Sequence, residues 1–429
     1  MNIVVIGGGA AGASAAVRAK RLSPESSVIL IERTDMVTHG PCAIPYYVEG
    51  LVKERSQLVT YSPQYLKEKR GIDVMVYTEA IGINIDKKVV VVRKRNGSVD
   101  RVPWDRLVIA TGALPILIPG HEMQNAVAIR HPAYADEIKN VLSKAKTVAI
   151  VGAGYLGIEM AEALLALGKK VLVFEKSSSV LSKALDADIA KIVEEETIHK
   201  GVELHLSEAV VEIVGRGRAE KVVTEKGEYP VDAVVLAVGV RPNTELVKDL
   251  GIATGVHGSI AVNEYMETSI EGIYAAGDVA EKYHIVLKKK VWIPLAPTAN
   301  KEGQVAGANA ARGRVLRFRG VVGTAVTKFF DLYIARTGIS EAEAREHNIK
   351  YRSATIKAKT KAHYYLGAAE IVLKVIVDGS GKIIGAQAVG KDISVAHYID
   401  LAAVAVERGM SIEDLFFSDL GYMPATAPV

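Results

Sequence analysis

The feature that most constrains this chain is a glycine-rich turn between a short apolar strand and a helix. In VVIGGGAAG, the residues Gly7, Gly9 and Gly12 have the spacing GxGxxG. The first glycine permits a tight turn, the second lets a pyrophosphate approach the backbone, and the third lets the helix, which we expect to begin near Ala13, pack on the strand. Glu32 follows 20 residues after Gly12, at the end of the next strand, where a carboxylate can bond a ribose diol. The segment therefore predicts a dinucleotide-binding unit.

A second copy of this pattern occurs in the middle of the chain. VAIVGAGYLG places Gly152, Gly154 and Gly157 at the same spacing, and Glu175 ends the following strand VLVFE. Two such units in one chain indicate two bound dinucleotides. Glu175 should repel the 2′-phosphate of NADPH and favour NADH, whereas the adjacent Lys176 would accommodate NADPH, so both nucleotides stay open at this point.

Composition narrows the class of protein. The chain has 49% hydrophobic and 24% charged residues and a net charge of +4, which excludes disordered and fibrous proteins and does not require nucleic acid as a partner. A single cysteine, Cys42, excludes intrachain disulfides, zinc ribbons and iron–sulfur sites, so we expect no metal. With no signal-peptide core and no apolar span of ~20 residues, we expect a soluble cytoplasmic protein. Only five glutamines, beside abundant Lys, Glu, Val and Ile, favour a thermophilic source.

The order of apolar runs predicts the domain organisation. Strand-like runs alternate with amphipathic helical stretches up to about residue 312, which is typical of parallel sheets with crossover helices. Beyond residue 323 the pattern changes to an α+β domain, with strands expected over 354–360, 370–377 and 382–389 and a helix over 394–408. The fold class that we expect is therefore α/β, with two Rossmann-like domains followed by an α+β domain.

Two further motifs resemble those of the pyridine nucleotide–disulfide oxidoreductases. IYAAGDV at Ile273–Val279 resembles the second FAD fingerprint of that family, and LVIATGALP at Leu107–Pro115 resembles its ATG motif. The resemblance covers essentially the whole chain and implies an FAD domain over 1–114 and 240–318, an NAD(P)H domain over 115–239 and a dimerisation domain over 319–429. It implies cofactor contacts at Gly7, Gly9, Ala11, Gly12, Glu32, Arg33, Ala80, Ala110, Thr111, Gly112, Arg130, Asp278, Ala296, Thr298, Ala299, Gly152, Gly154, Tyr155, Leu156, Glu159, Glu175, Lys176 and Gly239.

The cysteine motif narrows the resemblance to one branch of the family. Members with a protein dithiol carry CxxxxC after the first glycine unit, whereas this chain has HGPCAIPYYVEG. That motif resembles the single-cysteine branch of coenzyme A (CoA) disulfide reductases, CoA-dependent sulfur or polysulfide reductases, NADH oxidases and NADH peroxidases. The peroxidase and many water-forming oxidases of this branch have a histidine just inside the first glycine motif. Ala10 and Ala11 stand there in this chain, which disfavours peroxide reduction.

Tyrosines near the C-terminus also resemble those of the CoA disulfide reductases. In those proteins a YY pair and a tyrosine in a terminal segment reach the cysteine of the partner subunit, which implies a homodimer. AHYYLG supplies Tyr364 and Tyr365, and DLGYMPATAP supplies Tyr422. We expect Tyr364 and Tyr422 to be the reaching pair, with Tyr365 as the alternative to Tyr364. Met423 and Ala425 depart from the terminal pattern, and family members usually extend beyond the position of Val429.

The lone cysteine suggests how the chemistry would run. Cys42 stands where a helix is expected to begin, and a helix N-terminus stabilises a thiolate. Without a second cysteine, the partner sulfur must come from an exogenous thiol, which makes a mixed disulfide between Cys42 and CoA the most economical intermediate. Tyr364 and Tyr422 could then protonate the departing thiolate. The resemblance places the CoA contacts at Ser14, Arg18, Arg21, Thr38, His39 and Arg70.

The leading hypothesis is an FAD-dependent NAD(P)H oxidoreductase that reduces CoA disulfide, CoA persulfide, polysulfide or elemental sulfur through Cys42. A rival with the same fold is an NADH oxidase, in which Cys42 passes through a sulfenic acid during reduction of oxygen or peroxide. A rival of another class is an electron-transfer flavoprotein that reduces a small redox protein while Cys42 is a bystander. The role of Cys42 separates the three hypotheses.

Overall fold

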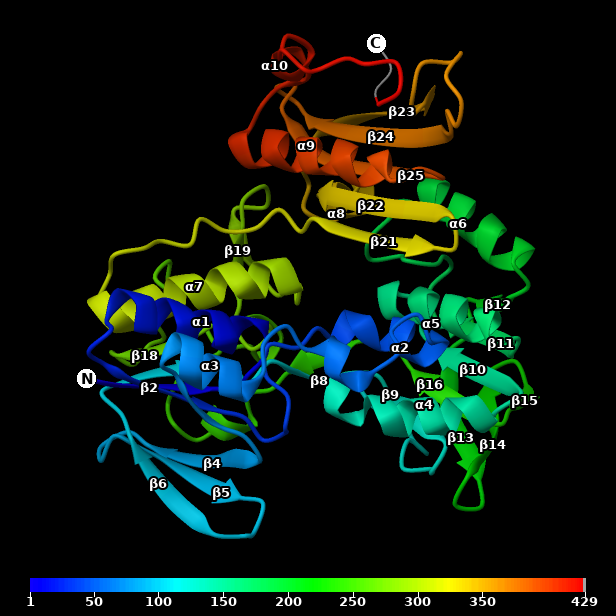
Figure 1. Ribbon diagram of the computed structural model, residues 1–429. Helices are drawn as coiled ribbons and strands as arrows, with labels where there is room; N and C mark the ends of the chain where they lie inside the picture. The colour runs from blue at the N-terminus through cyan, green and yellow to red at the C-terminus, as the bar shows by residue number, and fades with distance from the viewer. Residues whose placement is uncertain (427–429) are drawn as a thin grey trace.

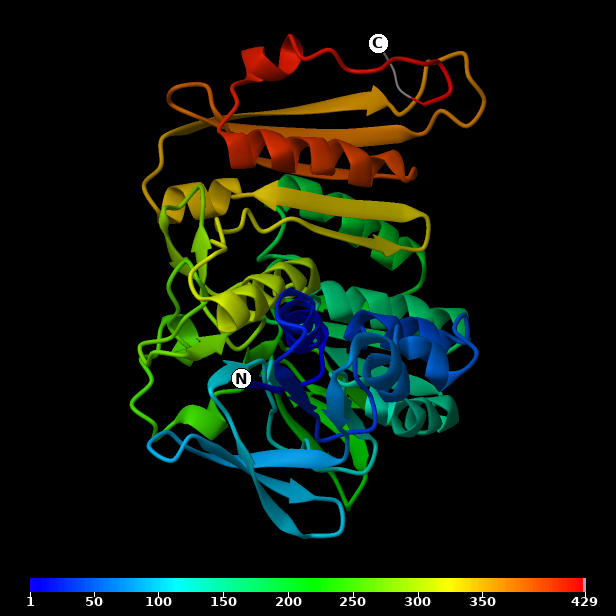
Figure 2. The ribbon, with the colours of Figure 1, turned by 60° about the vertical axis from the view of Figure 1, so that its left-hand side comes forward.

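The computed structural model of this chain describes residues 1–426 and has three parts (Figure 1). Two of them, each built on a parallel sheet, lie side by side, and the third, from residue 325 onward, lies above both (Figures 1 and 2). Residues 427–429, the end of the third domain expected from the sequence, lie outside the described residues. Within residues 1–426, no helix is both long enough and apolar enough to cross a membrane.

The first part is a sheet of five parallel strands with helices beside it. Its elements are β1 (Asn2–Ile6), α1 (Ala10–Leu22), β2 (Ser27–Ile31), α3 (Pro63–Arg70), β3 (Asp73–Met75), β7 (Arg106–Ile109), β18 (Ile273–Ala275) and α7 (Ala296–Arg312). The strand order is β18-β7-β1-β2-β3, and the runs are continuously apolar because both faces of the inner strands are buried. α1 begins at Ala10, three residues before the expected start, so that Gly12 lies inside its first turn.

The second part repeats this architecture. Its elements are β9 (Ala126–Ala128), α4 (Ala135–Lys144), β10 (Thr147–Val151), α5 (Tyr155–Ala166), β11 (Lys170–Glu175), α6 (Ala187–His199), β12 (Glu203–Leu206) and β16 (Ala233–Leu236). All neighbouring strands pair in parallel in the order β12-β11-β10-β16-β9. The two Rossmann-like units expected from the glycine motifs are thus confirmed.

Each unit also carries a small antiparallel sheet, which the sequence analysis did not predict. One consists of β4 (Thr78–Asn84), β5 (Val89–Lys94) and β6 (Val99–Pro103), and the other of β13 (Val210–Gly215), β14 (Ala219–Thr224) and β15 (Glu228–Pro230). Both sheets stand at the same place in their unit, between an edge strand of the parallel sheet (β3 or β12) and the strand that returns beside the central one (β7 beside β1, β16 beside β10). The internal repeat therefore extends beyond the glycine turns.

Two short strands form the double connection between the first two parts. They are β8 (Ala113–Pro115) and β17 (Val240–Pro242), which pair antiparallel with Val240 opposite Pro115. The domain boundaries expected at 114/115 and 239/240 fall at this pair, and the division itself stays a prediction. The remaining small elements are the strands β19 (Lys282–His284) and β20 (Lys289–Val291) and 3-10 turns at Pro41–Ala43, Arg55–Leu58, Pro132–Tyr134, Glu245–Val247 and Val256–Gly258.

The third part is a five-stranded antiparallel sheet with a long helix against it. Its elements are β21 (Ala325–Phe329), β22 (Leu332–Gly338), α8 (Glu341–Glu346), β23 (Tyr351–Lys359), β24 (Glu370–Asp378), β25 (Ile383–Gly390), α9 (Ser394–Arg408) and α10 (Ile412–Phe416). The strand order is β21-β22-β25-β24-β23, and α9 packs on β22 and β25. The three expected strands and the expected helix are confirmed to within about three residues, whereas β21 and β22 were not predicted.

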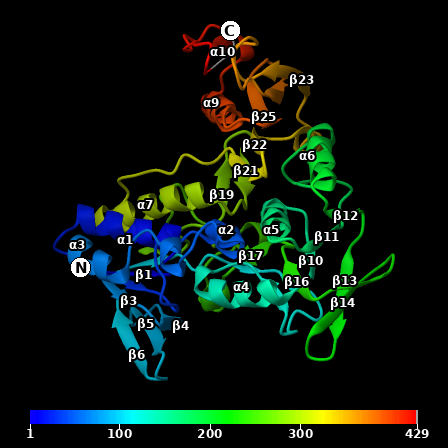
Figure 3. The same ribbon diagram turned by 45° about the vertical axis from the view of Figure 1, so that its right-hand side comes forward.

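One short helix from the N-terminal region packs between the other two parts. This helix is α2 (Ile44–Glu49), and Figure 3 shows it against α5. Its residues Ile44 and Val48 share one buried apolar cluster with Ile158 of α5 and with Phe329 at the end of β21. Because Cys42 directly precedes α2, the chain carries its only cysteine to the junction of all three parts.

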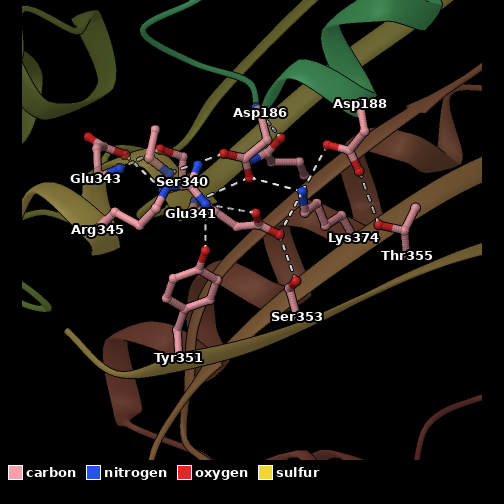
Figure 4. Close-up of polar contacts among 12 residues, drawn as sticks. Asp186, Asp188, Ser340, Glu341, Glu343, Arg345, Tyr351, Ser353, Thr355 and Lys374 are labelled. Carbon is pink, nitrogen blue, oxygen red and sulfur yellow. Dashed lines mark hydrogen bonds and ion pairs between the residues drawn. The ribbon is translucent and has the colours of Figure 1, made fainter. Parts of the chain in front are cut away.

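A polar cluster fixes the third part to the second (Figure 4). The ammonium group of Lys374, a side chain only 4% exposed, lies 3.3 Å from Asp186 and 2.8 Å from both Asp188 and Glu341. Asp186 precedes α6 and also exchanges two hydrogen bonds with Gln387 of β25, at 2.8 and 2.7 Å. A lysine surrounded by three carboxylates is strongly anchored once it is buried, so this cluster holds the two parts in one relative position.

Candidate active site

The turn between β1 and α1 leaves one of its three glycines open to a ligand. Gly7 has φ +103°, and a Cβ there would lie 2.2 Å from the carbonyl oxygen of Ala110. A Cβ on Gly12 would lie 1.8 Å from the carbonyl oxygen of Gly7. At Gly9, in contrast, the nearest atoms belong to the ring of His39, at 3.8 Å. Gly7 and Gly12 therefore serve the close packing of the turn, and Gly9 offers bare backbone where a pyrophosphate is expected.

Glu32 holds this turn from the end of β2. Its carboxylate is 6% exposed and accepts hydrogen bonds from the N–H groups of Gly8, at 2.9 Å, and Thr34, at 2.8 Å. Oε1 also accepts from the Thr34 hydroxyl at 2.9 Å, so Oε2, which accepts only from Gly8 among the described residues, has a further lone pair for a ribose hydroxyl. Arg33, the next residue, is exposed, and Ala80 is half-buried in β4, which is brought beside β2 by the bond from Thr78 N–H to the Glu32 carbonyl at 2.9 Å.

The turn between β10 and α5 has nearly the same geometry. Gly152 has φ +106° and approaches the Ala237 carbonyl oxygen, which would lie 2.4 Å from a Cβ, and a Cβ on Gly157 would lie 2.0 Å from the Gly152 carbonyl oxygen. No atom lies within 4 Å of a Cβ built on Gly154. Glu175 accepts hydrogen bonds from Ala153 N–H at 2.9 Å and Ser177 N–H at 2.8 Å. The second unit thus repeats both the open glycine and the anchored acid.

The other residues expected at the second dinucleotide lie around this turn. Tyr155 and Leu156 are the first residues of α5 and are half-buried. Lys176 is exposed beside Glu175, and Gly239, with φ +106°, is exposed just before β17. These positions are compatible with a nucleotide laid across the carboxyl ends of β10 and β11.

The ATG segment and the second fingerprint meet because their strands are neighbours. β7 and β18 pair in parallel with Ile109 opposite Ala275, so Ala110, Thr111 and Gly112 lie beside the turn that follows β18. Asn243, which the sequence analysis missed, fastens this segment: its N–H donates to the Gly112 carbonyl at 2.9 Å, and its carbonyl accepts from the Thr111 hydroxyl at 2.7 Å. No signal in the sequence links residues so far apart.

Asp278, the acid expected at the flavin ribityl chain, is half-buried and paired. Its carboxylate accepts from the Arg130 guanidinium at 2.6 Å, and Arg130 Nε donates to the Ala113 carbonyl at 2.9 Å. The Trp292 indole N–H donates to the backbone carbonyl of Asp278 at 2.8 Å. Asp278 and Arg130 were expected independently as cofactor contacts, and the structure brings them together.

The N-terminal end of α7 points toward the same turn. It carries Ala296, Thr298 and the buried Ala299, and a Cβ on Gly277 would meet Ala299 at 3.5 Å and Ala11 of α1 at 2.8 Å. A helix N-terminus offers unpaired N–H groups, which suit the polar edge of a flavin pyrimidine ring. The open Gly9 backbone, the Glu32 carboxylate and this helix end therefore fit an FAD, and the open Gly154 backbone with Glu175 fits an NAD(P)H.

A buried ion pair beneath this turn was also missed by the sequence analysis. The side chains of Glu302 in α7 and Lys282 in β19 are both 0% exposed, with 3.4 Å between Nζ and Oε2. Glu302 also accepts from Gly277 N–H at 2.8 Å, and Lys282 donates to the Gly277 carbonyl at 2.9 Å. Burial, partly offset by Lys282, raises the pKa of Glu302 to about 7. The pair clamps the residue that directly precedes Asp278.

His39 lies beside the first glycine turn and packs against another histidine, with the two rings tilted by 57°. Its ring centroid is 4.1 Å from that of His131, and its Nε2 is 3.9 Å from a Cβ built on Gly9. Burial lowers the pKa of both rings, that of His131 to about 3. Both imidazoles are therefore neutral at pH 7, which removes a positive charge that a phosphate contact at His39 would use.

Cys42 lies in the 3-10 turn Pro41–Ala43, immediately before α2, and is exposed. The helix expected at this cysteine is present. The expectation of a stabilised thiolate is not met: the surrounding protein and the Glu159 carboxylate raise the pKa of the Cys42 thiol, and a backbone hydrogen bond only partly offsets them. The pKa of Tyr46, which lies one turn further along the chain in α2, is also raised, mainly by burial and in addition by the Glu159 carboxylate.

The residues expected to bind CoA lie around α1 and α3. Ser14 accepts a hydrogen bond from Asn300 at 2.8 Å, Arg21 is exposed, and Arg18 is half-buried with an Nε that has no partner within residues 1–426. Arg70, in the last turn of α3, lies over the Tyr65 ring at 5.7 Å. Thr38 has φ +53° and its hydroxyl bonds the backbone of Tyr61.

Tyr364 and Tyr422 lie together at the outer edge of the third part. Their hydroxyl oxygens are 3.5 Å apart, and the two side chains are 67% and 52% exposed. The loops that carry them are joined by a hydrogen bond from Ala362 N–H to the Pro424 carbonyl at 3.1 Å. This edge lies at the end of the third part that is far from α2 (Figures 1 and 2), so the loops that carry the two tyrosines do not approach the α2 of their own chain.

Comparison with known families gives the class of protein. Residues 1–303 match the family described as pyridine nucleotide-disulphide oxidoreductase, and residues 324–429 match the dimerisation domain of that family. The chain therefore belongs to the pyridine nucleotide-disulphide oxidoreductases, as its motifs indicated. Members of this family use FAD and NAD(P)H, the two cofactors that the glycine turns fit.

Individual relatives cover nearly the whole length of this chain. An NAD(P)H coenzyme A polysulfide/persulfide reductase of Pyrococcus horikoshii is 46% identical over 100% of this chain and 96% of its own. An NADH oxidase of Methanocaldococcus jannaschii is 35% identical over 100% of this chain and 96% of its own. Among solved structures, an NAD-dependent persulfide reductase from A. fulgidus is 40% identical, with a TM-score of 0.96, over 100% of this chain and 81% of that one.

Proposed function

We propose that this chain is an FAD-dependent NAD(P)H oxidoreductase that reduces a sulfur–sulfur bond, in CoA disulfide, CoA persulfide, polysulfide or elemental sulfur, through Cys42. The observation that carries the proposal is the position of the only cysteine, exposed at the junction of the three parts and directly before α2. The relatives named as polysulfide/persulfide reductases support the same chemistry. A cysteine that must stay reduced suits the cytoplasm, and the likeness to Pyrococcus proteins suits a thermophilic source.

Different residues of the chain would bind the FAD and the nicotinamide nucleotide. FAD, when bound, passes two electrons from NAD(P)H to the sulfur held at Cys42. Gly9 and Glu32 would hold the FAD, Asp278 with Arg130 would orient it, and Gly154 with Glu175 would hold the nucleotide. Glu175 disfavours a 2′-phosphate, so we expect NADH to be used better than NADPH, while Lys176 provides the cation that tolerates NADPH.

The thiol chemistry at Cys42 balances without a second protein cysteine. The Cys42 thiolate attacks one sulfur of the substrate, the S–S bond breaks, and one thiol leaves with a proton while the other half stays on Cys42 as a mixed disulfide. Two electrons and one more proton release the second thiol and restore the thiolate. One NAD(P)H and one proton are thus consumed for each disulfide reduced to two thiols.

The binding of CoA would use the cations around α1. Arg18 and Arg21 lie on one face of α1 with Ser14, and Arg70 ends the neighbouring α3. The unpartnered Nε of Arg18 is a free donor for a phosphate oxygen. Thr38 and His39 would line the approach to Cys42, with the neutral His39 acting as a hydrogen-bonding neighbour.

The tyrosines would act on the partner subunit of a homodimer. Tyr364 and Tyr422 are exposed, their hydroxyl oxygens are 3.5 Å apart, and their loops lie far from the α2 of their own chain, as residues that complete a partner's site must. The family description of residues 324–429 as a dimerisation domain supports this arrangement. Their hydroxyl groups would donate protons to the departing thiolate.

Anaerobic oxidation of NADH tests the proposal. With oxygen excluded, we expect CoA disulfide or polysulfide to restore rapid NADH oxidation, and we expect intact mass spectrometry to find a CoA adduct on Cys42 that dithiothreitol removes. Cys42→Ser is the control that should lose both signals. Turnover that requires oxygen and ignores both sulfur substrates would contradict the proposal.

The second candidate is the NADH oxidase reaction, because a relative 35% identical carries that name. In that reaction Cys42 would pass through a sulfenic acid during reduction of oxygen or peroxide. Trapping with dimedone after exposure to oxygen would then label Cys42, and CoA disulfide would not protect it.

A further inference from the structure

Two tyrosine rings stack at the beginning of α3 and form what we call the tyrosine platform. The rings of Tyr61 and Tyr65 are nearly parallel, with centroids 4.8 Å apart and an angle of 12° between their planes. Tyr65 is half-buried against the core of the first part, whereas Tyr61 is 40% exposed. The stack is therefore supported by the core and ends in an exposed ring, which is a surface on which a flat aromatic ligand can stack.

Arginines lie next to this platform. Arg70, exposed in the last turn of α3, holds its guanidinium over the Tyr65 ring, 5.7 Å from the centroid. α3 lies beside α1 (Figure 1) and contacts it, and α1 carries the exposed Arg21 and the half-buried Arg18, whose Nε has no partner within the described residues. An aromatic surface with guanidinium groups around it suits a ligand in which an aromatic ring is joined to phosphates, such as a nucleotide.

One residue of the segment that leads to the cysteine holds the platform in place. The Thr38 hydroxyl accepts a hydrogen bond from Tyr61 N–H at 2.7 Å and donates one to the Tyr61 carbonyl at 2.8 Å. Thr38 N–H donates to the Gly8 carbonyl in the first glycine turn, at 2.8 Å. Thr38 also has φ +53°, which is strained for a β-branched residue, and such strain persists where surrounding contacts enforce it. Thr38 therefore fixes Tyr61 relative to the first glycine turn.

The same segment sets the distance from the platform to the cysteine. Residues 38–40 run antiparallel to residues 58–60, with a hydrogen bond from Thr60 N–H to the Thr38 carbonyl at 3.1 Å. Cys42 follows four residues after Thr38, and four residues of extended chain span at most about 14 Å. The pantetheine arm and diphosphate of CoA are long enough to bridge such a gap. An adenine on the platform and a sulfur at Cys42 can therefore belong to one CoA molecule.

We propose that the tyrosine platform binds the adenine of the CoA moiety, with Arg70 at its phosphates, so that the cysteine centre selects disulfides and persulfides that carry an adenine nucleotide. Tyr61 is then a specificity-determining residue, and Thr38 is the residue that positions it. No bond is made or broken at the platform. The inference rests on the proposed function in taking CoA as the carrier of the sulfur. Its first test uses a ligand without sulfur, so the two can fail separately.

Binding of adenosine 3′,5′-bisphosphate, which has the adenine and the 3′-phosphate of CoA but no sulfur, tests the platform directly. Isothermal titration calorimetry would use the FAD-loaded enzyme, with NAD⁺ added to fill the second glycine turn. We expect Tyr61→Leu to weaken binding about tenfold, because stacking of the base on the ring is lost. Tyr61→Phe keeps the ring and should bind the bisphosphate as the wild type does.

Anaerobic turnover shows which end of the substrate the platform contacts. Tyr61→Leu should raise the KM for CoA disulfide about tenfold and leave kcat unchanged, because the adenine is bound equally in the ground state and the transition state. Pantethine has the same disulfide arm as CoA disulfide but lacks the nucleotide. Its KM and kcat should therefore be the same in Tyr61→Leu and in the wild type.

The role of Thr38 is tested by combining variants. Thr38→Val removes both hydrogen bonds to the Tyr61 backbone and should weaken bisphosphate binding a few-fold, whereas Thr38→Ser keeps the hydroxyl and should restore the affinity. Adding Thr38→Val to Tyr61→Leu should change nothing further, because Thr38 acts only through the ring that has been removed.

Tyr265→Leu is the matched control. It removes another half-buried tyrosine that lies under arginines, since the guanidinium groups of Arg314 and Arg317 are 5.5 and 5.4 Å from its ring centroid. We expect it to leave bisphosphate binding unchanged. Visible absorption of the flavin and the melting temperature show whether each variant is folded.

Four results would overturn the inference: no binding of the bisphosphate to the wild type, wild-type affinity in Tyr61→Leu, equal losses in Tyr61→Leu and Tyr265→Leu, or a KM for pantethine that rises as much as that for CoA disulfide. The last of these would place the effect of Tyr61 at the sulfur end of the substrate. Bisphosphate binding that depends on Tyr61, without reduction of any sulfur substrate, would support the platform and contradict the proposed function.

Discussion

The two glycine turns of this chain share their φ angles and anchoring hydrogen bonds, yet their surroundings differ. Gly7 and Gly152 have φ values of +103° and +106°, and Glu32 and Glu175 each accept a 2.9 Å hydrogen bond from the middle of their turn. Around the first turn, however, segments from three other regions of the chain close in. The ring of His39 lies beside Gly9, whereas nothing lies within 4 Å of a Cβ on Gly154.

This difference indicates that the glycine turn determines that a dinucleotide binds, whereas the segments packed around the turn determine whether the dinucleotide is retained or exchanged. The first unit is covered by α7 and by the turn after β18, which are held by the buried Lys282–Glu302 pair. Its Glu32 is 6% exposed, whereas Glu175 is only half-buried and Lys176 is exposed. An enclosed turn suits a retained FAD, and an open turn suits a nucleotide that must leave after each cycle.

The largest effect that we predict is a loss of turnover without any loss of cofactor binding in either unit. Cys42→Ser should lower turnover with CoA disulfide by roughly 10³-fold or more, because the serine hydroxyl is a far weaker nucleophile than a thiolate. FAD absorbance and binding of NADH, measured by fluorescence, should stay unchanged because neither turn contains Cys42. Loss of FAD from this variant would instead mean that Cys42 supports the fold of the first unit.

Alanine at either packing glycine should destabilise the fold, but the two variants should differ in which cofactor they bind poorly. A Cβ would lie 1.8 Å from a carbonyl oxygen in Gly12→Ala and 2.0 Å in Gly157→Ala, so each costs about 3 kcal/mol of folding free energy. Only Gly12→Ala should also release FAD, because α1 packs against α7, while Gly157→Ala should keep the flavin and bind NADH weakly. Denaturant unfolding and flavin release on a desalting column measure these outcomes.

Gly154→Ala is the matched control, since its Cβ has open space. It should preserve stability and raise only the KM for NADH. A stability loss equal to that of Gly157→Ala would contradict the distinction between packing glycines and open glycines.

The buried acid beneath the first unit should make stability depend on pH. Burial raises the pKa of Glu302 from about 4.5 in the unfolded chain to about 7, so the folded state binds this proton more tightly. The stabilisation is fully present below pH 4.5 and is lost as pH rises through 7, by about 3 kcal/mol. In Glu302→Gln this part of the pH dependence should vanish in guanidinium unfolding between pH 4 and pH 8. Identical pH slopes in both proteins would contradict it.

The smallest effect concerns nucleotide choice at the open turn. Glu175→Ala removes the charge that repels a 2′-phosphate and should raise kcat/KM for NADPH relative to NADH by about tenfold. Lys176→Ala should lower the use of NADPH by a few-fold and leave NADH unchanged. Steady-state rates with the two nucleotides measure both variants, and an unchanged ratio in Glu175→Ala would place the selectivity elsewhere.

Much of the fold could be predicted because it depends on local pattern. The glycine turns, the continuous apolar strands and the change to an antiparallel pattern after residue 323 are all features of neighbouring residues. The small sheets were missed although one of them has a local signal typical of a hairpin, the Asn96–Gly97 pair between the valine run 89–92 and the alternating residues 98–102. The start of α1 was predicted three residues too late because Gly12, a residue type that disfavours helices, lies inside the helix that already begins at Ala10.

The individual residues of the site could be predicted from the sequence, but the contacts between them could not. Cys42, Asp278, Arg130 and Glu159 were all named from motifs, yet nothing in the sequence pairs Asp278 with Arg130, 148 residues away, or Glu159 with Thr327, 168 residues away. The charge state of Cys42 was not predicted either: its position before a helix suggested a thiolate, whereas partial desolvation by the surrounding protein and the Glu159 carboxylate raise the pKa of its thiol.

By itself, then, the sequence determined the two dinucleotide turns, the acids that follow them and the single reactive sulfur, because backbone freedom at glycine and residue chemistry are local properties. Only the tertiary structure decided which turn is enclosed, which charges are paired and which elements meet at Cys42. Those outcomes depend on burial and on distances of a few ångströms between segments remote in the chain, and electrostatic energies change steeply with both.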